Sequence, residues 1–194
     1  MLSRNMTKNV HFFIESHLSQ WGKENLIAMD GTLGNGYDLE FLNNQKAIST
    51  IYGFDIQAQA LENSKTRIGE TEKCIYYIQD SHHHLECYIE GEIDLALFNL
   101  GYLPGADKSI VTRVDTTLEA IEKTIGKLSN GGMVVVMTYP GHEEGRREHE
   151  AVKDYLSGLH KKNLSILQLN VNNVIKPCPN CCLLYTSPSP RDTR

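Results

Sequence analysis

Short apolar runs rich in β-branched residues alternate along the chain with stretches whose apolar residues recur every three or four positions. The short runs predict strands, and the periodic stretches predict amphipathic helices. Strands are expected at 25–30, 49–55, 74–79, 93–99, 133–138 and 164–171, with a weaker seventh at 182–185. Helices are expected at 9–20, 37–43, 57–67, 116–128 and 149–159. This alternation is typical of an α/β fold with a mostly parallel sheet and helices on both faces.

The length and composition predict one folded domain over residues 1–185. The chain has 194 residues, 40% of them hydrophobic and 22% charged, and no linker rich in Pro, Gly or Ser divides it before residue 185. Residues 186–194 read TSPSPRDTR. Because proline lacks the N–H that a sheet requires, we expect this segment to be a disordered or artefactual tail.

Several classes of protein are disfavoured by composition. The longest apolar run, 133–137, is far shorter than the roughly 20 residues of a membrane span. The first residues lack the apolar core of a secretory signal, so a cytoplasmic location with no membrane association is expected. The five cysteines are expected to be reduced. No metal is expected, because the CxxC pair at 178–181 lacks a second ligand pair at matched spacing. A net charge of -5 disfavours general nucleic-acid coating, but it allows a local basic patch.

A glycine-rich turn, DGTLGNG at 30–36, lies between an expected strand and an expected helix. Glycines at such a turn let the backbone approach a ligand closely. The spacing is not GxGxxG, so a dinucleotide pyrophosphate is not the first choice. The GK[ST] ending of a phosphate-binding loop is also absent, which excludes a nucleoside triphosphatase.

Polar residues end four of the expected strands: Asp30, Asp55, Asp80 and Asn99. Each alone could be a helix cap, but the carboxyl ends of parallel strands form the ligand crevice of such sheets. An acidic residue after the second strand accepts hydrogen bonds from ribose hydroxyls. An acidic crevice repels a pyrophosphate and suits a cationic sulfonium, which favours S-adenosylmethionine over NAD.

Two loops carry candidate acceptor chemistry. NLGYLPG at 99–105 is similar to the Asn-Pro-Pro-Tyr motif of amino-directed methyltransferases, although a plain surface turn is the alternative. Methyl transfer to an amine needs a positioned lone pair, and the Asn99 side-chain oxygen and the Leu100 carbonyl can accept the amine hydrogens. Tyr102 could stack on a target base. In YPGHEEG at 139–145, His142 could accept a proton or bind substrate.

These segments, with FDIQAQALENS and QDSHHHL, resemble the small bacterial methyltransferases long labelled rRNA methylases, a family now understood as tRNA 5-aminomethyl-(2-thio)uridine methyltransferases. The resemblance runs from about residue 13 to 171. It implies a Rossmann-like class I fold with a seven-stranded, mostly parallel sheet and S-adenosylmethionine as cofactor. The implied acceptor is the exocyclic amine of 5-aminomethyl-(2-thio)uridine at wobble position 34 in the tRNA anticodon loop. The implied product is 5-methylaminomethyl-(2-thio)uridine. Members of the family often form homodimers.

The resemblance also assigns roles to residues. The implied cofactor residues are His17 (from the family's Ser-His pair), Asp30, Thr32, Gly34, Asn35, Gly36, Asp38, Asp55, Ile56, Asp80, Ser81, His82, Asn99 and Leu100. The implied catalytic residues are Asn99, Tyr102, Asp107 and His142. The implied substrate-binding residues are Leu103, Pro104, Gly105, Lys108, Tyr139, Gly141 and Arg146. An alkylamine with a pKa of roughly 10.4 is mostly protonated at neutral pH, so Asp107 and His142 are the hypothesised proton acceptors.

Other functions stay open at this point. The acceptor could be rRNA, a protein or a small-molecule amine, or the chain could be a non-catalytic S-adenosylmethionine-binding protein. The full 99–105 loop counts against a binding protein, which needs no acceptor pocket. Basic residues at the expected mouth of the site favour RNA over a small amine: Lys108, Arg113, Arg146 and Arg147. The C-terminus departs from the family, whose apolar last strand is replaced here by the short run at 182–185 and the tail.

Overall fold

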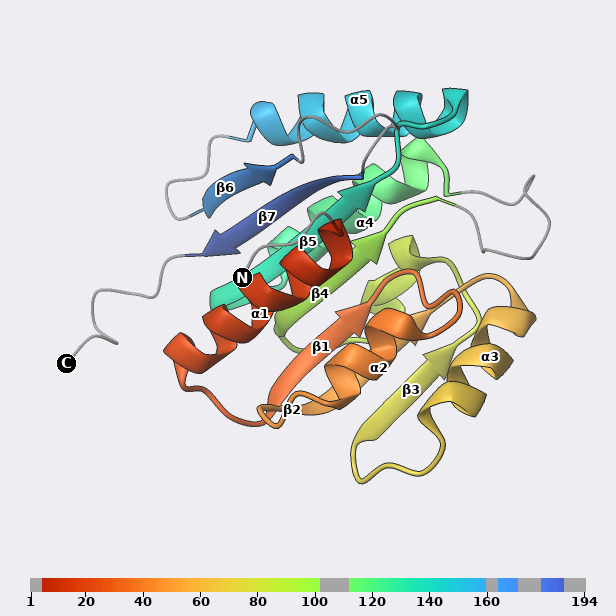
Figure 1. The fold of residues 1–194 in the computed structure, drawn as a ribbon, viewed down its shortest axis with the longest axis vertical. Helices are drawn as coiled ribbons and strands as arrows, with labels where there is room; N and C mark the ends of the chain where they lie inside the picture. The colour runs from red at the N-terminus through yellow and green to blue at the C-terminus, as the bar shows by residue number, and fades with distance from the viewer. Residues whose placement is uncertain (1–4, 102–111, 160–163, 171–178, 187–194) are drawn as a thin grey trace.

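The computed structural model describes residues 5–101, 112–159, 164–170 and 179–186. Within these residues, seven strands form one sheet in the order β3-β2-β1-β4-β5-β7-β6 (Figure 1). The strands are β1 (Leu26–Asp30), β2 (Ile48–Phe54), β3 (Cys74–Ile78), β4 (Ile93–Asn99), β5 (Leu128–Thr138), β6 (Leu164–Leu169) and β7 (Asn180–Thr186). The strands β1 to β5 are parallel, whereas β7 runs antiparallel to both β5 and β6. The expected seven-stranded, mostly parallel sheet is confirmed.

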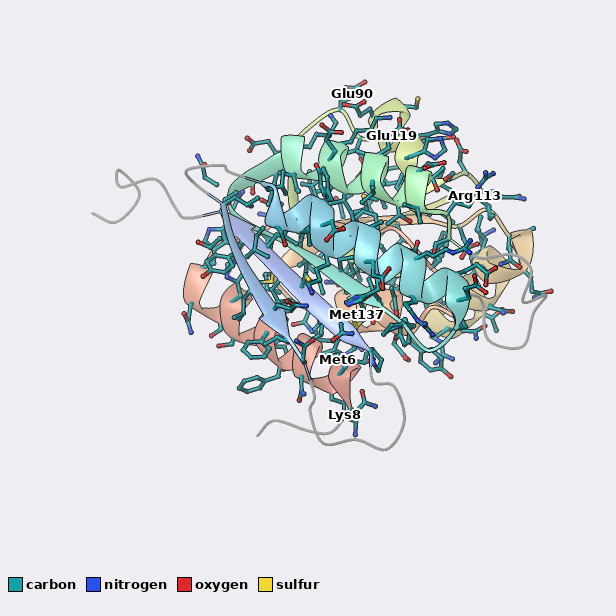
Figure 2. The ribbon with its side chains drawn as sticks, turned by 90° about the horizontal axis from the view of Figure 1, so that it is seen from above. Met6, Lys8, Glu90, Arg113, Glu119 and Met137 are labelled. Carbon is teal, nitrogen blue, oxygen red and sulfur yellow. The ribbon has the colours of Figure 1, made fainter. Side chains whose placement is uncertain are left out.

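Helices cover both faces of this sheet, as expected. They are α1 (Met6–Trp21), α2 (Tyr37–Asn43), α3 (Ala58–Ile68), the 3-10 helix η1 (His82–Cys87), α4 (Val114–Gly126) and α5 (Glu143–Ser157). The buried apolar residues of α1 and α2, with Leu61 of α3, belong to one core cluster, and those of η1, α4 and α5 belong to the other. The view from above in Figure 2 shows α1 on one side of β6 and β7, with α4 and α5 on the other.

The first helix shows how local sequence sets these elements. Val10, Ile14 and Leu18 lie one turn apart and are buried, which gives α1 one apolar face. The Asn5 side chain accepts the Lys8 N–H at the start of the helix, and Gly22 ends the helix in the left-handed conformation. The result is a helix three residues longer at its start than the periodicity predicts.

The strand β5, which lies between β4 and β7, is buried on both faces. Met133, Val135 and Met137 pack into the α1 side, while Val134 and Val136 pack into the α4 side. A strand covered by helices on both faces needs this continuous apolar run, because no side of it meets water. This burial explains why the run at 133–137 is the most apolar in the chain.

Three boundaries around α4, β5 and α5 differ from the predictions. The strand begins at Leu128, where the sequence favours the end of a helix, and α4 ends at Gly126. Gly131 has a φ of 83°, and the pairing with β4 shifts register before Leu95. Helix α5 begins at Glu143, whereas the periodicity predicts a start at 149. The first turns were missed because two of their buried positions, Gly145 and Glu148, are not apolar and so interrupt the helical period.

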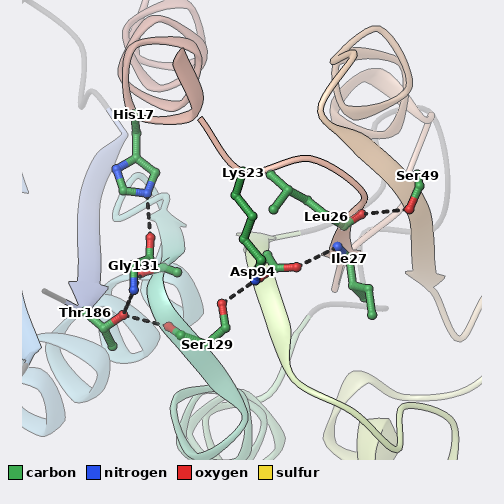
Figure 3. A network of polar contacts seen from close by, with 10 residues as sticks. His17, Lys23, Leu26, Ile27, Ser49, Asp94, Ser129, Gly131 and Thr186 are labelled. Carbon is green, nitrogen blue, oxygen red and sulfur yellow. Dashed lines mark hydrogen bonds and ion pairs between the residues drawn. The ribbon is translucent and has the colours of Figure 1, made fainter. Parts of the chain in front are cut away.

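The strand β7 is longer than the run at 182–185 predicts. It begins at Asn180 and ends at Thr186, the first residue of the expected tail. The Thr186 hydroxyl accepts the Gly131 N–H at 2.8 Å and donates to the Ser129 carbonyl at 2.7 Å (Figure 3). Thr186 is therefore part of the sheet, and residues 187–194 lie outside the described residues.

The amino ends of the central strands are joined by buried Asp94, the second residue of β4. Its carboxylate accepts hydrogen bonds from Lys23 Nζ at 2.7 Å, Ile27 N at 2.9 Å and Ser129 Oγ at 2.6 Å (Figure 3). These contacts join the amino ends of β1, β4 and β5 to one another. At the opposite, carboxyl ends of the strands, β1 lies between β2 and β4, so successive connections go to opposite sides of β1. This switch creates the crevice where doubly wound sheets bind ligands.

No helix in the described residues is long and apolar enough to cross a membrane.

Candidate functional site

A cavity of about 720 Å³ lies at the carboxyl ends of the parallel strands. Loops after β1, β2, β3, β4 and β5 all contribute to its lining. The sequence-predicted residues that line it are Thr32, Gly34, Asn35, Asp38, Asp55, Ile56, Asp80, Ser81, His82, Asn99, Leu100, Tyr139, Gly141 and His142. The topology therefore brings the expected cofactor and acceptor loops to one cavity, whose volume suits a nucleoside-sized ligand.

Four predicted residues lie elsewhere. Asp30 is fully buried at the end of β1, next to the lining residues, and Gly36 is the N-cap of α2. Arg146 is exposed on α5. His17 is not in the cavity lining, because its ring donates from Nε2 to the Gly131 carbonyl at 2.8 Å, near the amino edge of the sheet (Figure 3). This position does not agree with the cofactor role that the resemblance implies for His17. The predicted acceptor residues Tyr102, Leu103, Pro104, Gly105, Asp107 and Lys108 lie outside the described residues.

The glycine-rich turn is held by the two aspartates that flank it. Asp30 Oδ1 accepts the Thr32 N–H at 3.0 Å, and Asp55 Oδ2 accepts the Gly34 N–H at 3.0 Å. Gly36 has a φ of 77°, and a Cβ there would lie 2.9 Å from the Ser64 backbone. The residue types that predict the turn therefore also fix its shape before any ligand binds.

The buried acids make this end of the cavity receptive to a cation. Burial raises the pKa of Asp30 well above its usual value, and the nearby charge of Asp38 raises it further. Burial also raises the pKa of Asp55. Both shifts mean that the ionised carboxylates are disfavoured in the protein alone, and a cation bound nearby would stabilise the ionised form.

Two buried polar atoms have no hydrogen-bond partner among the described residues: Asp30 Oδ2 and His82 Nε2. His82 donates from Nδ1 to the Gly31 carbonyl at 2.9 Å, so Nε2 of the neutral ring is an acceptor. Burial lowers the pKa of His82, which favours that neutral ring. S-adenosylmethionine carries an ammonium group, hydroxyls and an adenine amine that could donate to such acceptors, as well as a positive sulfonium. The residues present therefore fit this cofactor.

Asp80 follows β3 and already has protein partners. His84 Nδ1 donates to Oδ1 at 2.9 Å, and the Tyr88 hydroxyl donates to Oδ2 at 2.9 Å. The hydrogen bond from His84, above all, lowers the pKa of Asp80. Asp80 is thus an ionised carboxylate at the rim of the cavity.

Across the described residues, no three His, Cys, Asp or Glu side chains lie close enough to hold a metal ion.

On the acceptor side, Asn99 is the last residue of β4. Its backbone N–H donates to Thr32 Oγ1 at 2.7 Å, and its Nδ2 donates to Asp38 Oδ2 at 3.0 Å. Asp38 Oδ1 lies 3.0 Å from His11 Nε2. Asp38, which the resemblance assigns to the cofactor, therefore binds Asn99 and a histidine of α1. His11 has no motif around it, so sequence reasoning did not find it.

His142 lines the cavity and also caps α5. Its Nδ1 accepts the Gly145 N–H at 3.0 Å, so the neutral ring carries its hydrogen on Nε2. A Cβ at position 145 would overlap the Tyr139 carbonyl, which explains the glycine. The cap therefore holds the His142 ring at the cavity, and its role as proton acceptor or substrate ligand stays a prediction.

Comparison with known proteins agrees with this site. The family model described as "Putative rRNA methylase" matches residues 51–185. A curated relative from Arabidopsis thaliana, "tRNA (mnm(5)s(2)U34)-methyltransferase, chloroplastic", is 35% identical over 144 residues, which are 68% of this chain and 53% of the relative. The chain thus spans about half the length of that relative.

Two solved structures share the fold over nearly their whole length. A "putative rRNA-methylase" from Clostridium thermocellum has a TM-score of 0.88 and 29% identity, covering 96% of this chain and 100% of its own. A "putative methyltransferase" from Streptococcus mutans, solved in complex with SAH (S-adenosylhomocysteine), has a TM-score of 0.83 and 32% identity. It covers 96% of this chain and 99% of its own. With a family match across most of the sheet, an SAH-bound relative and a cavity that fits the cofactor, the chain belongs to the rRNA methylase family of class I, S-adenosylmethionine-dependent methyltransferases.

Proposed function

We propose that this chain methylates the exocyclic amine of 5-aminomethyl-(2-thio)uridine at position 34 of tRNA, giving 5-methylaminomethyl-(2-thio)uridine. The observation that carries the proposal is Asn99, which stands in the cavity with its amide nitrogen bound to Asp38. An amide held in this way offers its carbonyl oxygen to a hydrogen-bond donor such as an amine. The name of the Arabidopsis relative supports this nucleoside as the acceptor.

The cofactor, when bound, supplies an electrophilic methyl group on a positive sulfur. The chain's own residues then act by positioning. Asn99 Oδ1 and the Leu100 carbonyl accept hydrogens from the neutral amine, which leaves its lone pair free to face the methyl group. Holding the amine in this orientation turns a bimolecular encounter into a reaction within one complex, which can account for a large share of the rate.

Basic side chains near the cavity support an RNA acceptor over a small amine. Arg113 lines the cavity and is exposed at the start of α4 (Figure 2). Arg146 and Arg147 are exposed on the first turns of α5, the helix that His142 of the lining caps. Such residues contact phosphates without reading sequence. The homodimer and the cytoplasmic location stay predictions.

The test uses purified full chain, isotope-labelled S-adenosylmethionine and tRNA from cells that lack this protein, followed by mass analysis of the nucleosides. Labelled 5-methylaminomethyl-(2-thio)uridine is the expected product. Asn99→Ala should lose this product and still bind SAH in calorimetry. Label on rRNA, protein or a small amine in place of the tRNA would overturn the proposed substrate. SAH binding with no transfer to any acceptor would favour a non-catalytic binding protein.

A further inference from the structure

One carboxylate joins three elements on the acceptor side of the cavity. Asp38 in α2 is 5% exposed. Its Oδ2 accepts a 3.0 Å hydrogen bond from Asn99 Nδ2 at the end of β4. Its Oδ1 lies 3.0 Å from Nε2 of His11 in α1. Residues far apart in the sequence, on two helices and one strand, therefore form one chain of contacts that ends at Asn99.

This chain of contacts decides which way the Asn99 amide points. Asp38 Oδ2 accepts a hydrogen from the Asn99 amide, and only the amide nitrogen can donate one, so the nitrogen and not the oxygen faces Asp38. The amide carbonyl oxygen then lies on the side away from Asp38. A reversed amide would present N–H groups where an amine needs an acceptor.

His11 is built to hold Asp38 in this role. By the same logic, its Nε2 must carry the hydrogen that Asp38 Oδ1 accepts. The ring stacks on Phe41 with centroids 3.7 Å apart and planes 7° apart, which fixes the direction of that N–H. Without this donor, a buried carboxylate oxygen would lose its partner, and Asp38 would be free to turn away from Asn99.

We propose that His11 is a positioning residue for methyl transfer: through Asp38, it keeps the Asn99 amide oxygen available to the acceptor amine. The inference rests on the proposed function, because it assigns His11 a part in binding that amine. It also makes a structural claim about Asn99 that can be measured without any acceptor. His11 touches neither the substrate nor the cofactor in this account.

Two substitutions separate the two contacts of His11. His11→Phe keeps a ring to stack on Phe41 and removes the donor to Asp38. His11→Gln removes the ring and keeps an N–H at a similar reach. If His11 serves only to pack α1, His11→Phe should be the milder change. If it positions Asn99 through Asp38, His11→Gln should be the milder one.

The first measurement is hydrogen exchange of the Asn99 side-chain amide, followed by nitrogen-15 NMR, with the signal assigned by its loss in Asn99→Ser. Loss of a hydrogen bond to a charged group predicts exchange about tenfold faster in His11→Phe, with little change in His11→Gln. Unchanged exchange in folded His11→Phe would overturn the inference, whatever the enzyme acts on.

The second measurement is steady-state kinetics on tRNA that carries the 5-aminomethyl group. In His11→Phe, kcat should fall about tenfold while SAH affinity stays at the wild-type value, and His11→Gln should recover most of the loss. Equal kcat in His11→Phe and wild type overturns the inference. Absence of transfer by wild type overturns the proposed function instead, and the exchange measurement still decides the role of His11.

Discussion

The hydroxyl group of Thr112 donates a 2.9 Å hydrogen bond to the buried carboxylate of Glu148. The Thr112 hydroxyl oxygen also accepts the Gly101 N–H at 3.1 Å, and the Thr112 N–H donates to the Gly101 carbonyl at 3.1 Å. Glu148 also accepts a 2.8 Å bond from Thr117, and it is 4% exposed. The residues on either side of segment 102–111, which holds much of the predicted acceptor loop, are therefore tied to each other and to α5.

Thr112→Val should weaken use of the acceptor without weakening the cofactor. The change removes one bond to Glu148 and one from Gly101, so the two ends of the acceptor segment keep only the backbone bond from the Thr112 N–H to the Gly101 carbonyl. We expect kcat/KM for tRNA to fall about fivefold to tenfold, in line with the loss of about 1–1.5 kcal/mol per hydrogen bond, with unchanged SAH affinity. Thr117→Val is the matched control, because it removes a bond to Glu148 and leaves Gly101 untouched. Equal kinetic losses in the two variants would show that the link at Gly101 is unimportant.

Asp30→Asn should stabilise the protein alone and weaken cofactor binding. The folded-state pKa of Asp30 lies above its unfolded value, so the ionised group penalises the fold. That penalty is absent below about pH 3.9, the unfolded pKa of an aspartate, grows as the pH rises from there to the folded pKa, and is constant at higher pH. Urea unfolding at a series of pH values should show the advantage of the variant increasing toward alkaline pH.

The same variant separates charge from shape at the cofactor site. Asparagine can still accept the Thr32 N–H through its amide oxygen, so the turn should keep its form. Removing a negative charge should weaken binding of the cationic S-adenosylmethionine more than binding of SAH, whose sulfur is neutral. Calorimetry with both ligands measures the difference. An equal loss for the two ligands would mean that Asp30 acts through hydrogen bonding alone.

Gly36→Ala should be more harmful than Gly22→Ala, although both glycines have positive φ. A Cβ at position 22 meets nothing within 4 Å, so only the backbone conformation is strained, at a cost of about 1 kcal/mol. At position 36 the Cβ would also press on the Ser64 backbone at 2.9 Å, which cannot move aside like a flexible side chain. We expect Gly36→Ala to lower both the free energy of unfolding and SAH affinity, and Gly22→Ala to lower only the first. Similar unfolding curves for the two variants would contradict this contact.

The sequence was sufficient to predict the elements whose apolar period is clear and the turn that the aspartates hold. The run at 93–99 became β4 with the expected bounds. Within it, residues 95–98 alternate between the two apolar layers on either side of the sheet. The start of α5 was missed because Glu148, an inward residue, is charged and its partners Thr112 and Thr117 are distant in the sequence. Long-range pairs of this kind leave no periodic signal.

The candidate site shows the same division. Asp30, Asp55 and Asn99 were predicted because strand ends in a parallel sheet share one edge. His11 was missed because its role depends on how α1 crosses α2, which no local pattern encodes. The resemblance places His17 at the cofactor, but its partner Gly131 lies near the amino end of β5, away from the cavity at the carboxyl ends of the strands. Thr186 was assigned to the tail by the composition that follows it, although its hydroxyl completes the pairing at the end of β7.

Asp94→Ala should destabilise the fold far more than Lys23→Ala, although the two residues form one ion pair. Asp94 is 5% exposed and accepts bonds from Ile27 N and Ser129 Oγ as well as from Lys23 (Figure 3). Removing it leaves buried donors without a partner, at about 3 kcal/mol or more. The Lys23 side chain is 45% exposed, so its loss should cost at most about 1 kcal/mol. Urea unfolding measures both, and SAH affinity should be unchanged in each variant because the network lies at the opposite edge from the cavity. If the two variants were equally unstable, the ion pair itself, and not the bonds to Ile27 and Ser129, would be what holds this edge together.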